Sequence, residues 1–305
     1  MQRVLVTGVN GLVGGAIFAH LERTGAYSLI GTVREETQKQ PPRNNAVFAT
    51  FDLAREADLF ALQASCGTLD AVVHVAAAVG KNLQSETLID ANCRGVLHCI
   101  ALASSLGARR FVFISSIQVI GAPLSLPVTE DHPVNPQSLY HITKLFGEQA
   151  LLLEENRPLH PAILRISSPL GPGMRPEGIA SVFLRNASRN QDIVLHGKGG
   201  REQNYIDTRD IALAVDRALR TTATGVYNIA GVSAIANRDF AGLCKAVCRS
   251  SSTIAYSGRE DAEEDVRWRI ATGKAAAELG FTPRHTLEES LLHALSGGSR
   301  TEPVL

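Results

Sequence analysis

The chain has 305 residues, of which 45% are hydrophobic and 20% charged, and its formal net charge at pH 7 is zero. A chain of this length can bury one large core, or a large core and a smaller one. The balanced charge gives no overall field that attracts nucleic acid or an anionic membrane surface. No apolar run approaches the roughly 20 residues of a membrane-spanning helix. We therefore expect a globular protein whose partner is a small-molecule substrate, with neither nucleic acid nor a membrane as ligand.

Apolar runs and helical spacing alternate along the first half of the chain. Six short apolar runs predict strands buried on both faces, at residues 3–6, 27–33, 46–51, 71–75, 110–114 and 162–166. Helical spacing of apolar residues predicts helices between or after them, of which the clearest are 12–23, 85–106 and 138–155. Strands alternating with helices predict an α/β fold, a Rossmann-type doubly wound parallel sheet with helices on both faces.

The pattern changes after Pro169, where glycine- and proline-rich turns become frequent. Short apolar runs predict three further strands there, at 193–195, 226–229 and 253–256. We read this part as a smaller α/β region, partly interwoven with the first, that closes over a cleft. The chain then divides into a dinucleotide-binding domain, a substrate-binding region and a tail, at residues 1–168, 169–296 and 297–305.

The N-terminus and the cysteines bear on the compartment. The chain becomes glycine-rich at Gly8, too early for the apolar region of a signal peptide. Five scattered cysteines include no Cys-x-x-Cys pair. Cys244 and Cys248 have the spacing of one helix face, but no histidine or further cysteine lies near them in sequence, so we expect buried thiols and no metal. Reduced thiols favour a cytoplasmic protein.

A Gly-x-x-Gly-x-x-Gly series follows the first predicted strand. Gly8 suits a tight turn, Gly11 lets the backbone approach a pyrophosphate, and Gly14 lets the helix pack on the sheet. The start of that helix offers unpaired amides and a partial positive charge to phosphate. The series therefore predicts a nicotinamide dinucleotide site whose contacts include Gly8, Asn10, Gly11, Leu12, Val13 and Gly14.

The residues after the second and third strands bear on the cofactor. An arginine after the second strand accommodates the 2′-phosphate of NADP, whereas a carboxylate there binds the ribose of NAD. Arg34 comes first, before Glu35 and Glu36, so we predict NADP, with NAD as the alternative. Asp52, followed by Leu53, can accept from the adenine amino group or cap the next helix.

Tyr140 and Lys144 lie four residues apart on a predicted helix, hence on one face. A neighbouring ammonium lowers the pKa of a phenol, so we expect Tyr140 to exchange a proton while hydride moves at a carbonyl or alcohol carbon. Ser116, at the end of the fifth strand, can bond the same oxygen. Beside the dinucleotide turn, these three residues predict an oxidoreductase.

At this point the chain resembles the extended short-chain dehydrogenases/reductases of the NAD(P)-dependent epimerase/dehydratase family. The resemblance covers nearly the whole chain in order, at residues 7–14, 74–77, 92–95, 113–121, 140–144, 164–172, 204–211 and 276–281. It implies Ser116 rather than Ser115 as the catalytic serine, Tyr140 as the acid/base, and Lys144 as the residue that holds the nicotinamide ribose. It further implies cofactor or active-site contacts at Ala76, Ala77, Asn92 and Pro169, and a homodimer formed through helices 85–106 and 138–155.

The substrate end departs from the pattern of nucleotide-sugar members. Ser168 stands where those members carry an asparagine, and Gln203 stands where an arginine grips the diphosphate. Arg201 or Arg267 can supply that charge instead, unless ion pairs hold them. Gln118 lies beside Ser116 on the substrate side, and the lack of an acidic residue after Ser116 disfavours a dehydratase.

Three functions remain open at this point. The first is an epimerase or oxidoreductase acting on a sugar or nucleotide sugar. The second is an NADPH-dependent carbonyl reductase of a small ketone or natural-product intermediate, favoured by the stretch ending in Arg34. The third is a non-catalytic dinucleotide-sensing protein, which the presence of both Tyr140 and Lys144 disfavours.

Overall fold

The computed structural model describes residues 1–43, 45–80, 83–153 and 158–296. The end of the helix expected over 138–155 and the expected tail over 297–305 lie partly or wholly outside the described residues. Among the described residues, no helix is long and apolar enough to cross a membrane.

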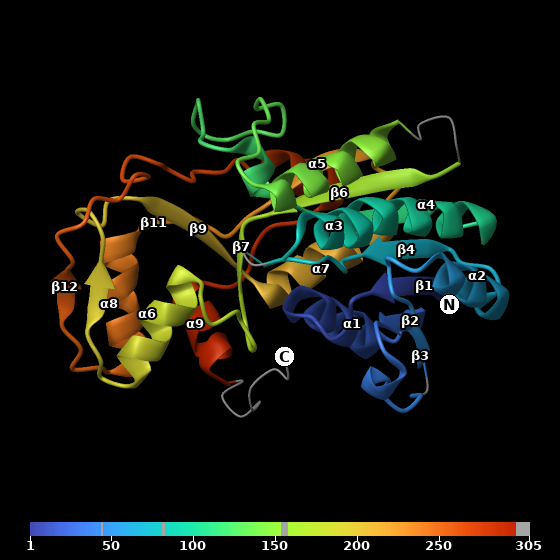
Figure 1. The fold of residues 1–305 in the computed structure, drawn as a ribbon, viewed down its shortest axis with the longest axis horizontal. Coiled ribbons are helices and arrows are strands. Elements are labelled where there is room, and N and C mark those ends of the chain that lie inside the picture. Colours follow the sequence, from blue (N-terminus) through green and yellow to red (C-terminus); the bar gives the residue numbers. More distant parts are fainter. Residues whose placement is uncertain (44, 81–82, 154–157, 297–305) are drawn as a thin grey trace.

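A seven-stranded parallel sheet forms the centre of the fold (Figure 1). Its strand order is β10-β6-β5-β4-β1-β2-β3, and every neighbouring pair is parallel. The strands are β1 (Gln2–Thr7), β2 (Tyr27–Val33), β3 (Ala46–Thr50), β4 (Ala71–His74), β5 (Arg110–Ser116), β6 (His160–Ile166) and β10 (Gly225–Ile229). This order confirms the doubly wound α/β fold expected from the alternation of strands and helices.

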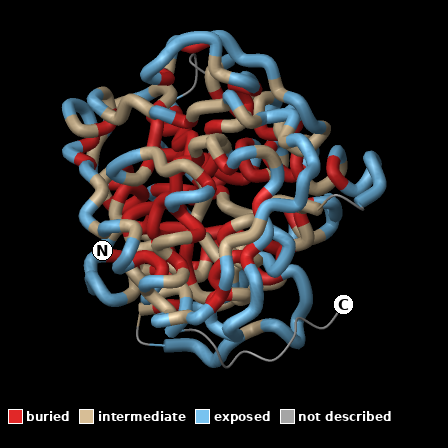
Figure 2. Tube along the Cα trace, turned by 90° about the vertical axis from the view of Figure 1, so that its left-hand side faces the viewer, coloured by how far each residue is buried: buried red, intermediate tan, exposed pale blue. Residues whose placement is uncertain are grey.

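Helices cover both faces of the sheet because successive side chains of each strand point to opposite faces. Val4 and Val6 pack with α1 (Leu12–Thr24) and α7 (Thr208–Leu219) in one core. Leu5, between them, faces a second core with α2 (Glu56–Cys66), α4 (Gly95–Ser105) and α5 (Leu139–Leu152). Figure 2 shows these buried residues filling the middle of the molecule.

The helix expected over 85–106 is observed with one irregularity. It begins as α3 (Ser85–Leu88), widens into a π-helical stretch, η2 (Ile89–Arg94), and continues as α4. Such widened turns often occur at functional sites. Two short 3₁₀ helices, η1 (Glu36–Gln38) and η3 (Ile117–Ile120), follow β2 and β5.

A smaller α/β part lies beside the sheet, at the left of Figure 1. It contains the sheets β11-β9-β7 and β12-β8 and a core of its own. Its elements are β7 (Ser168–Leu170), α6 (Ile179–Ser188), β8 (Ile193–Leu195), β9 (Glu202–Asp207), β11 (Ala234–Ala236), α8 (Asn237–Cys248), β12 (Ile254–Tyr256) and α9 (Leu287–Ser296). The five cysteines of the chain are free thiols, and Cys244 is buried in this core.

One expected strand belongs to a different sheet. The sequence pattern groups the run 226–229 with the smaller region, but β10 pairs in parallel with β6 at the edge of the central sheet. Tyr227 and Ile229 are fully buried there. The helix α7 also returns to the main body and packs against α1, and the π-helical segment η4 (Ala275–Leu279) contacts it. The chain therefore crosses between the two parts several times, and the boundary at residue 168 stays a prediction.

Candidate active site

The glycine turn joins β1 to α1 at the carboxyl edge of the sheet. Gly8 has a φ of +72°, and a Cβ there would lie 2.8 Å from the backbone Cα of Ala76. A Cβ on Gly14 would overlap the carbonyl of Gly8. The helix begins after Gly11 without a side-chain cap, so the first amides of α1, including those of Leu12 and Val13, have no helical carbonyl to bond. An open backbone cradle at a helix start fits a dinucleotide pyrophosphate.

Thr7 connects this turn to the next strand. Its Oγ1 accepts from the N–H groups of Val75 and Ala76, both at 3.0 Å. Because that oxygen already accepts twice, its hydrogen donates to Nδ1 of His74, 3.0 Å away. Burial, with a smaller contribution from the Lys144 charge, lowers the pKa of His74 to about 3, so the imidazole is neutral. The half-buried loop of Ala76 and Ala77 is thereby held against Gly8.

The sequence pattern did not single out His74 as part of the site. In the sequence, His74 stands out only as one polar residue within an apolar strand. Buried histidines of this kind are common in protein cores and do not by themselves indicate a catalytic role.

Arg34 and the carboxylates after it lie at the end of β2. Arg34 is exposed, and its nearest acidic partner, Glu35, is 3.9 Å away. Glu35 is the N-cap of η1, and its N–H donates to Oε1 of Gln38 at 3.2 Å. Glu36 is bonded to Lys39 and Thr50. Of the three residues that bear on cofactor choice, the arginine is the one with the fewest contacts to the protein.

Asp52 closes a turn after β3. Its Oδ1 accepts from the N–H of Ala54 at 3.0 Å, and its Oδ2 lies 3.6 Å from Nε of Arg55. The helix α2 begins at Glu56, four residues after Asp52, and has Arg55 as its N-cap, so the alternative of Asp52 as a helix cap is wrong. The side chain of Leu53 is buried against Gly95, and its carbonyl lies 3.0 Å from Nδ1 of His98. Adenine contact by either residue stays a prediction.

Asn92 lies in the π-helical stretch η2 and is buried. Its Oδ1 accepts from the N–H of Ala78 at 2.7 Å. Its Nδ2 donates to the Ala78 carbonyl at 2.9 Å and to Oγ1 of Thr143 at 3.0 Å. Both amide hydrogens are therefore used within the protein. Asn92 holds the loop after β4 against α5, and its expected contact with the cofactor stays a prediction.

The two serines that end β5 face opposite ways. Ser115 is buried, and its hydroxyl donates to Oε1 of Glu148 at 2.5 Å. Ser116 is half-buried, and its oxygen accepts from the N–H of Gln118 at 3.2 Å, which caps η3. Because successive side chains of a strand alternate, Ser116 and not Ser115 faces the carboxyl edge of the sheet. Within the described part of the chain, the Ser116 hydroxyl accepts a hydrogen bond but donates none.

The helix α5 carries Tyr140 and Lys144 to the same edge. Ser138 caps its start by accepting from the N–H of His141. The buried Lys144 donates from Nζ to the carbonyl of Ile114, in β5, at 2.8 Å. Its Nζ also lies 4.9 Å from the ring centroid of Phe113 and 5.9 Å from that of Tyr140. The lysine therefore joins the face of α5 that carries Tyr140 to the strand that ends at Ser116.

The expected direction of the Tyr140 pKa is wrong for this structure. Burial dominates and raises the pKa of Tyr140 to about 12, against an opposing effect of the Arg175 charge. Burial also lowers the pKa of Lys144 to about 8. The ammonium is bonded to a backbone carbonyl instead of the phenol, which explains why it does not lower the tyrosine pKa. Sequence reasoning missed the exposed Arg175, for which no spacing pattern gave a signal.

The residues expected at the substrate end lie in η3, on β7, at the start of β9 and in the loop before η4. Ser168 and Pro169 pair with Tyr205 and Ile206 of β9 and are half-buried. Gln118 is half-buried in η3. These positions place Ser168, Pro169 and Gln118 beyond the ends of β6 and β5, as expected.

The two arginines expected to supply positive charge, and the neighbouring Gln203, are engaged with other protein groups. Arg201 forms an ion pair with Glu263. With its amide oxygen turned toward the guanidinium, Gln203 accepts from Nε of Arg201 at 2.6 Å. Arg267 donates to the carbonyl of Glu264 at 2.7 Å and lies 3.5 Å from Glu202. The alternative that these arginines are in ion pairs is the one observed.

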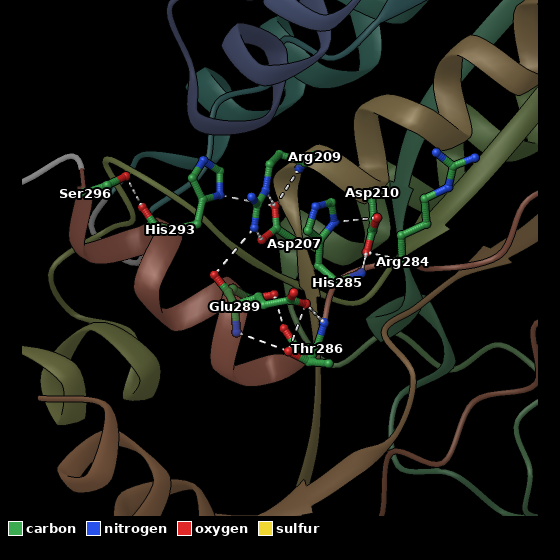
Figure 3. Close-up of polar contacts among 10 residues, drawn as sticks. Asp207, Arg209, Asp210, Arg284, His285, Thr286, Glu289, His293 and Ser296 are labelled. Carbon is green, nitrogen blue, oxygen red and sulfur yellow. Dashed lines mark hydrogen bonds and ion pairs between the residues drawn. The ribbon is translucent and has the colours of Figure 1, made fainter.

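A polar cluster joins α9 to the start of α7 (Figure 3). The buried Asp207 binds Arg209 through both carboxylate oxygens, at 2.9 and 2.7 Å, and lies 3.2 Å from Nδ1 of His293. Beside it is a cavity of about 640 Å³, whose lining includes Asn10, Gly11, Pro172, Arg209 and His293. The cluster thus brings the smaller part of the molecule against the glycine turn. Among the described residues, no group of three or more His, Cys, Asp or Glu side chains could hold a metal ion.

The parallel sheet, the glycine turn and the Ser116, Tyr140 and Lys144 set at its carboxyl edge define an NAD(P)-binding oxidoreductase of the extended short-chain type. A model of the family described as "NAD dependent epimerase/dehydratase family" matches residues 4–230. The chain belongs to this family and is an NAD(P)-dependent enzyme.

Similar proteins include nucleotide-sugar enzymes. A dTDP-glucose 4,6-dehydratase from Streptomyces antibioticus is 27% identical over 308 residues, which cover 96% of this chain and 91% of that protein. The solved UDP-glucose 4-epimerase from Thermotoga maritima, with UDP-glucose, superposes with a TM-score of 0.87 at 21% identity, covering 97% and 98% of the two chains. The UDP-glucuronic acid 4-epimerase from Bacillus cereus, in complex with NAD, has a TM-score of 0.82 at 21% identity, covering 97% and 98%. At such identities the solved structures support the fold.

Proposed function

We propose that the protein is an NAD(P)-dependent epimerase that moves hydride at a secondary alcohol or ketone carbon of a nucleotide sugar. The observation that carries this proposal is the Lys144–Ile114 hydrogen bond, which holds the Tyr140 face of α5 against the strand that ends at Ser116. The names of the similar dehydratase and epimerases support the substrate class.

Each of the three residues has a separate task in this proposal. Tyr140 exchanges a proton with the oxygen on the reacting carbon. Ser116 donates its free hydrogen to the same oxygen and stabilises the charge that develops there. Lys144 adds positive charge near the phenol and offers its remaining N–H groups to ribose hydroxyls. When bound, the nicotinamide supplies the acceptor and donor of hydride.

The backbone cradle of Gly8, Gly11 and Gly14 would hold the pyrophosphate of the cofactor. We propose NADP as the preferred form, because Arg34 is the first residue after β2, is exposed and lies 3.9 Å from Glu35, too far for a hydrogen bond. NAD is the alternative, supported by the family description and by similar structures solved with NAD. Tighter binding of NADH than of NADPH in a calorimetric titration would overturn the NADP preference.

We propose that Arg201 and Gln203 face the diphosphate of the substrate. Gln203 lies in β9 and Arg201 directly precedes that strand, and the Gln203 amide oxygen accepts from Nε of Arg201 at 2.6 Å, so the two side chains lie together. An incoming diphosphate would replace Glu263 as the partner of Arg201, since paired charged hydrogen bonds favour an arginine–phosphate contact.

The ion pair of Arg201 with Glu263 favours a second candidate, an NADPH-dependent reductase of a small uncharged ketone. One assay separates the two: the protein is incubated with each cofactor form and with UDP-hexoses, dTDP-hexoses or small ketones. An epimerase inverts one sugar carbon, seen by proton NMR, without net change in cofactor absorbance. Stoichiometric NADPH oxidation with a ketone, and no sugar conversion, would replace the epimerase with the reductase.

We also propose a homodimer through α3, α4 and α5. Ile89 of the intervening η2, Leu97 of α4, and Ile142 and Phe146 of α5 are exposed by 43%, 46%, 49% and 40%, although all are large and apolar. A second copy would cover this face, because contiguous exposed apolar surface marks interaction sites. A cytoplasmic location stays a proposal, supported by the five free thiols.

A further inference from the structure

Glu148 is buried on the same face of α5 as Lys144, one helical turn further along. Its carboxylate is held from two strands. Ser115 of β5 donates to Oε1 at 2.5 Å. Arg165 of β6 donates from Nε to Oε1 at 3.0 Å and from Nη2 to Oε2 at 2.7 Å. The arginine and carboxylate side chains are only 5% and 0% exposed.

A fully buried ion pair is weak evidence for stability, because the cost of removing both charges from water offsets their attraction. The location of the Glu148–Arg165 pair instead indicates a role in positioning α5. The pair joins α5, which carries Tyr140 and Lys144, to β5, which ends at Ser116, and to β6, which ends two residues before Ser168. Arg165 also donates to the carbonyl of Glu130, in the segment before α5. The network therefore fixes the helix relative to the edge where the reaction takes place.

The charge of Glu148 also acts on Lys144. Burial lowers the pKa of Lys144, and the Glu148 carboxylate opposes that lowering. The other groups around the ammonium are the Ile114 carbonyl and Phe113 ring of β5, the neutral His74 of β4 and the Tyr140 ring of its own helix. None of these carries a negative charge at neutral pH, since burial raises the pKa of Tyr140.

We propose that Glu148 is a positioning residue of the hydride-transfer site: it holds the Tyr140–Lys144 face of α5 against β5 and β6 and balances the buried ammonium with a negative charge. The inference rests on the role proposed above for Lys144. Glu148 acts through that lysine and contacts neither substrate nor cofactor in this assignment.

The central test is Glu148→Gln, which keeps the shape of the side chain and removes its charge. Without the carboxylate, a buried ammonium loses its proton more easily, so Lys144 titrates at lower pH. We expect the pH at which kcat/KM falls on the alkaline side to move down by about one unit. In protein labelled at lysine with ¹³C and ¹⁵N, the Lys144 signal is expected to titrate lower by the same amount. The NMR titration needs neither substrate nor cofactor.

A matched control is available on the other side of the sheet. Asp216 likewise accepts from a hydroxyl, that of Tyr27 at 2.6 Å, and from an arginine, Arg220 at 3.1 Å. It lies in α7, which packs against α1. Asp216→Asn is expected to lower the unfolding temperature but to leave the pH profile and the Lys144 titration unchanged.

Two further variants keep the test informative. Glu148→Asp retains the charge and is expected to restore the Lys144 titration toward that of the native protein. If Glu148→Gln does not fold, the double variant Glu148→Gln with Arg165→Met leaves no unpaired guanidinium and is expected to show a smaller downward shift, because removing the Arg165 charge acts in the opposite direction. An unchanged Lys144 titration in folded Glu148→Gln, or one that moves no lower in the double variant than in Arg165→Met alone, would overturn the inference. An active Tyr140→Phe variant would instead refute the proposed function, whatever the titration shows.

Discussion

Gly8 and Gly25 both have φ in the left-handed region, at +72° and +65°, but their surroundings differ. A Cβ on Gly25 would meet nothing within 4 Å, whereas one on Gly8 would lie 2.8 Å from the Ala76 backbone. Replacement by alanine at either position costs about 1–2 kcal/mol of backbone strain. At Gly8 the backbone contact adds about 1–3 kcal/mol, as overpacking does in a dense interior.

We therefore expect Gly25→Ala to lower the free energy of unfolding by about 1–2 kcal/mol and Gly8→Ala by about 2–5 kcal/mol. Gly8→Ala also displaces the loop of Ala76, so it is expected to weaken dinucleotide binding, which Gly25→Ala leaves intact. Gly14→Ala tests the contact alone, since its φ is not in the left-handed region and its Cβ would overlap the Gly8 carbonyl.

Urea unfolding followed by the fluorescence of Trp268, the one tryptophan of the chain, measures the stability term. Calorimetric titration with NADPH measures binding. Equal destabilisation by Gly8→Ala and Gly25→Ala, with the same cofactor affinity, would refute the close packing of the turn against Ala76 as the reason for glycine at position 8.

The remaining predictions concern chemistry, cofactor, loop and assembly. Tyr140→Phe is expected to lower turnover by about 10²–10⁴-fold with cofactor affinity nearly kept, whereas the exposed Tyr256→Phe is expected to change neither; an active Tyr140→Phe enzyme would rule out the acid/base role. Arg34→Glu is expected to weaken NADPH binding more than NADH binding in calorimetry, and equal losses would contradict a 2′-phosphate contact. Asn92→Ala removes three hydrogen bonds and is expected to cost about 1–3 kcal/mol of unfolding free energy and to raise KM for the cofactor; an unchanged KM would show that the loop keeps its position without Asn92. Phe146→Glu is expected to give a monomer by light scattering, and a dimer that persists would remove α5 from the interface.

Much of the fold and half of the site were predictable from local patterns. Apolar runs and helical spacing identify the strands and helices because each element is a repeat of a few residues with a fixed period. The glycine series is equally local, since it spans a single strand–helix junction. Tyr140 and Lys144 fall on one face because a helix returns to the same side every three to four residues.

The tertiary structure alone decided which of these residues meet across the chain. In the folded chain Ser115 donates a hydrogen bond to Glu148, whereas Ser116 lies at the candidate site. Strand β10 pairs with β6 of the central sheet rather than with the strands of the smaller part. It also pairs Arg201 with Glu263 and raises the pKa of Tyr140 through burial. Such outcomes depend on contacts between residues far apart in sequence, and on the loss of water around them, which no local period encodes.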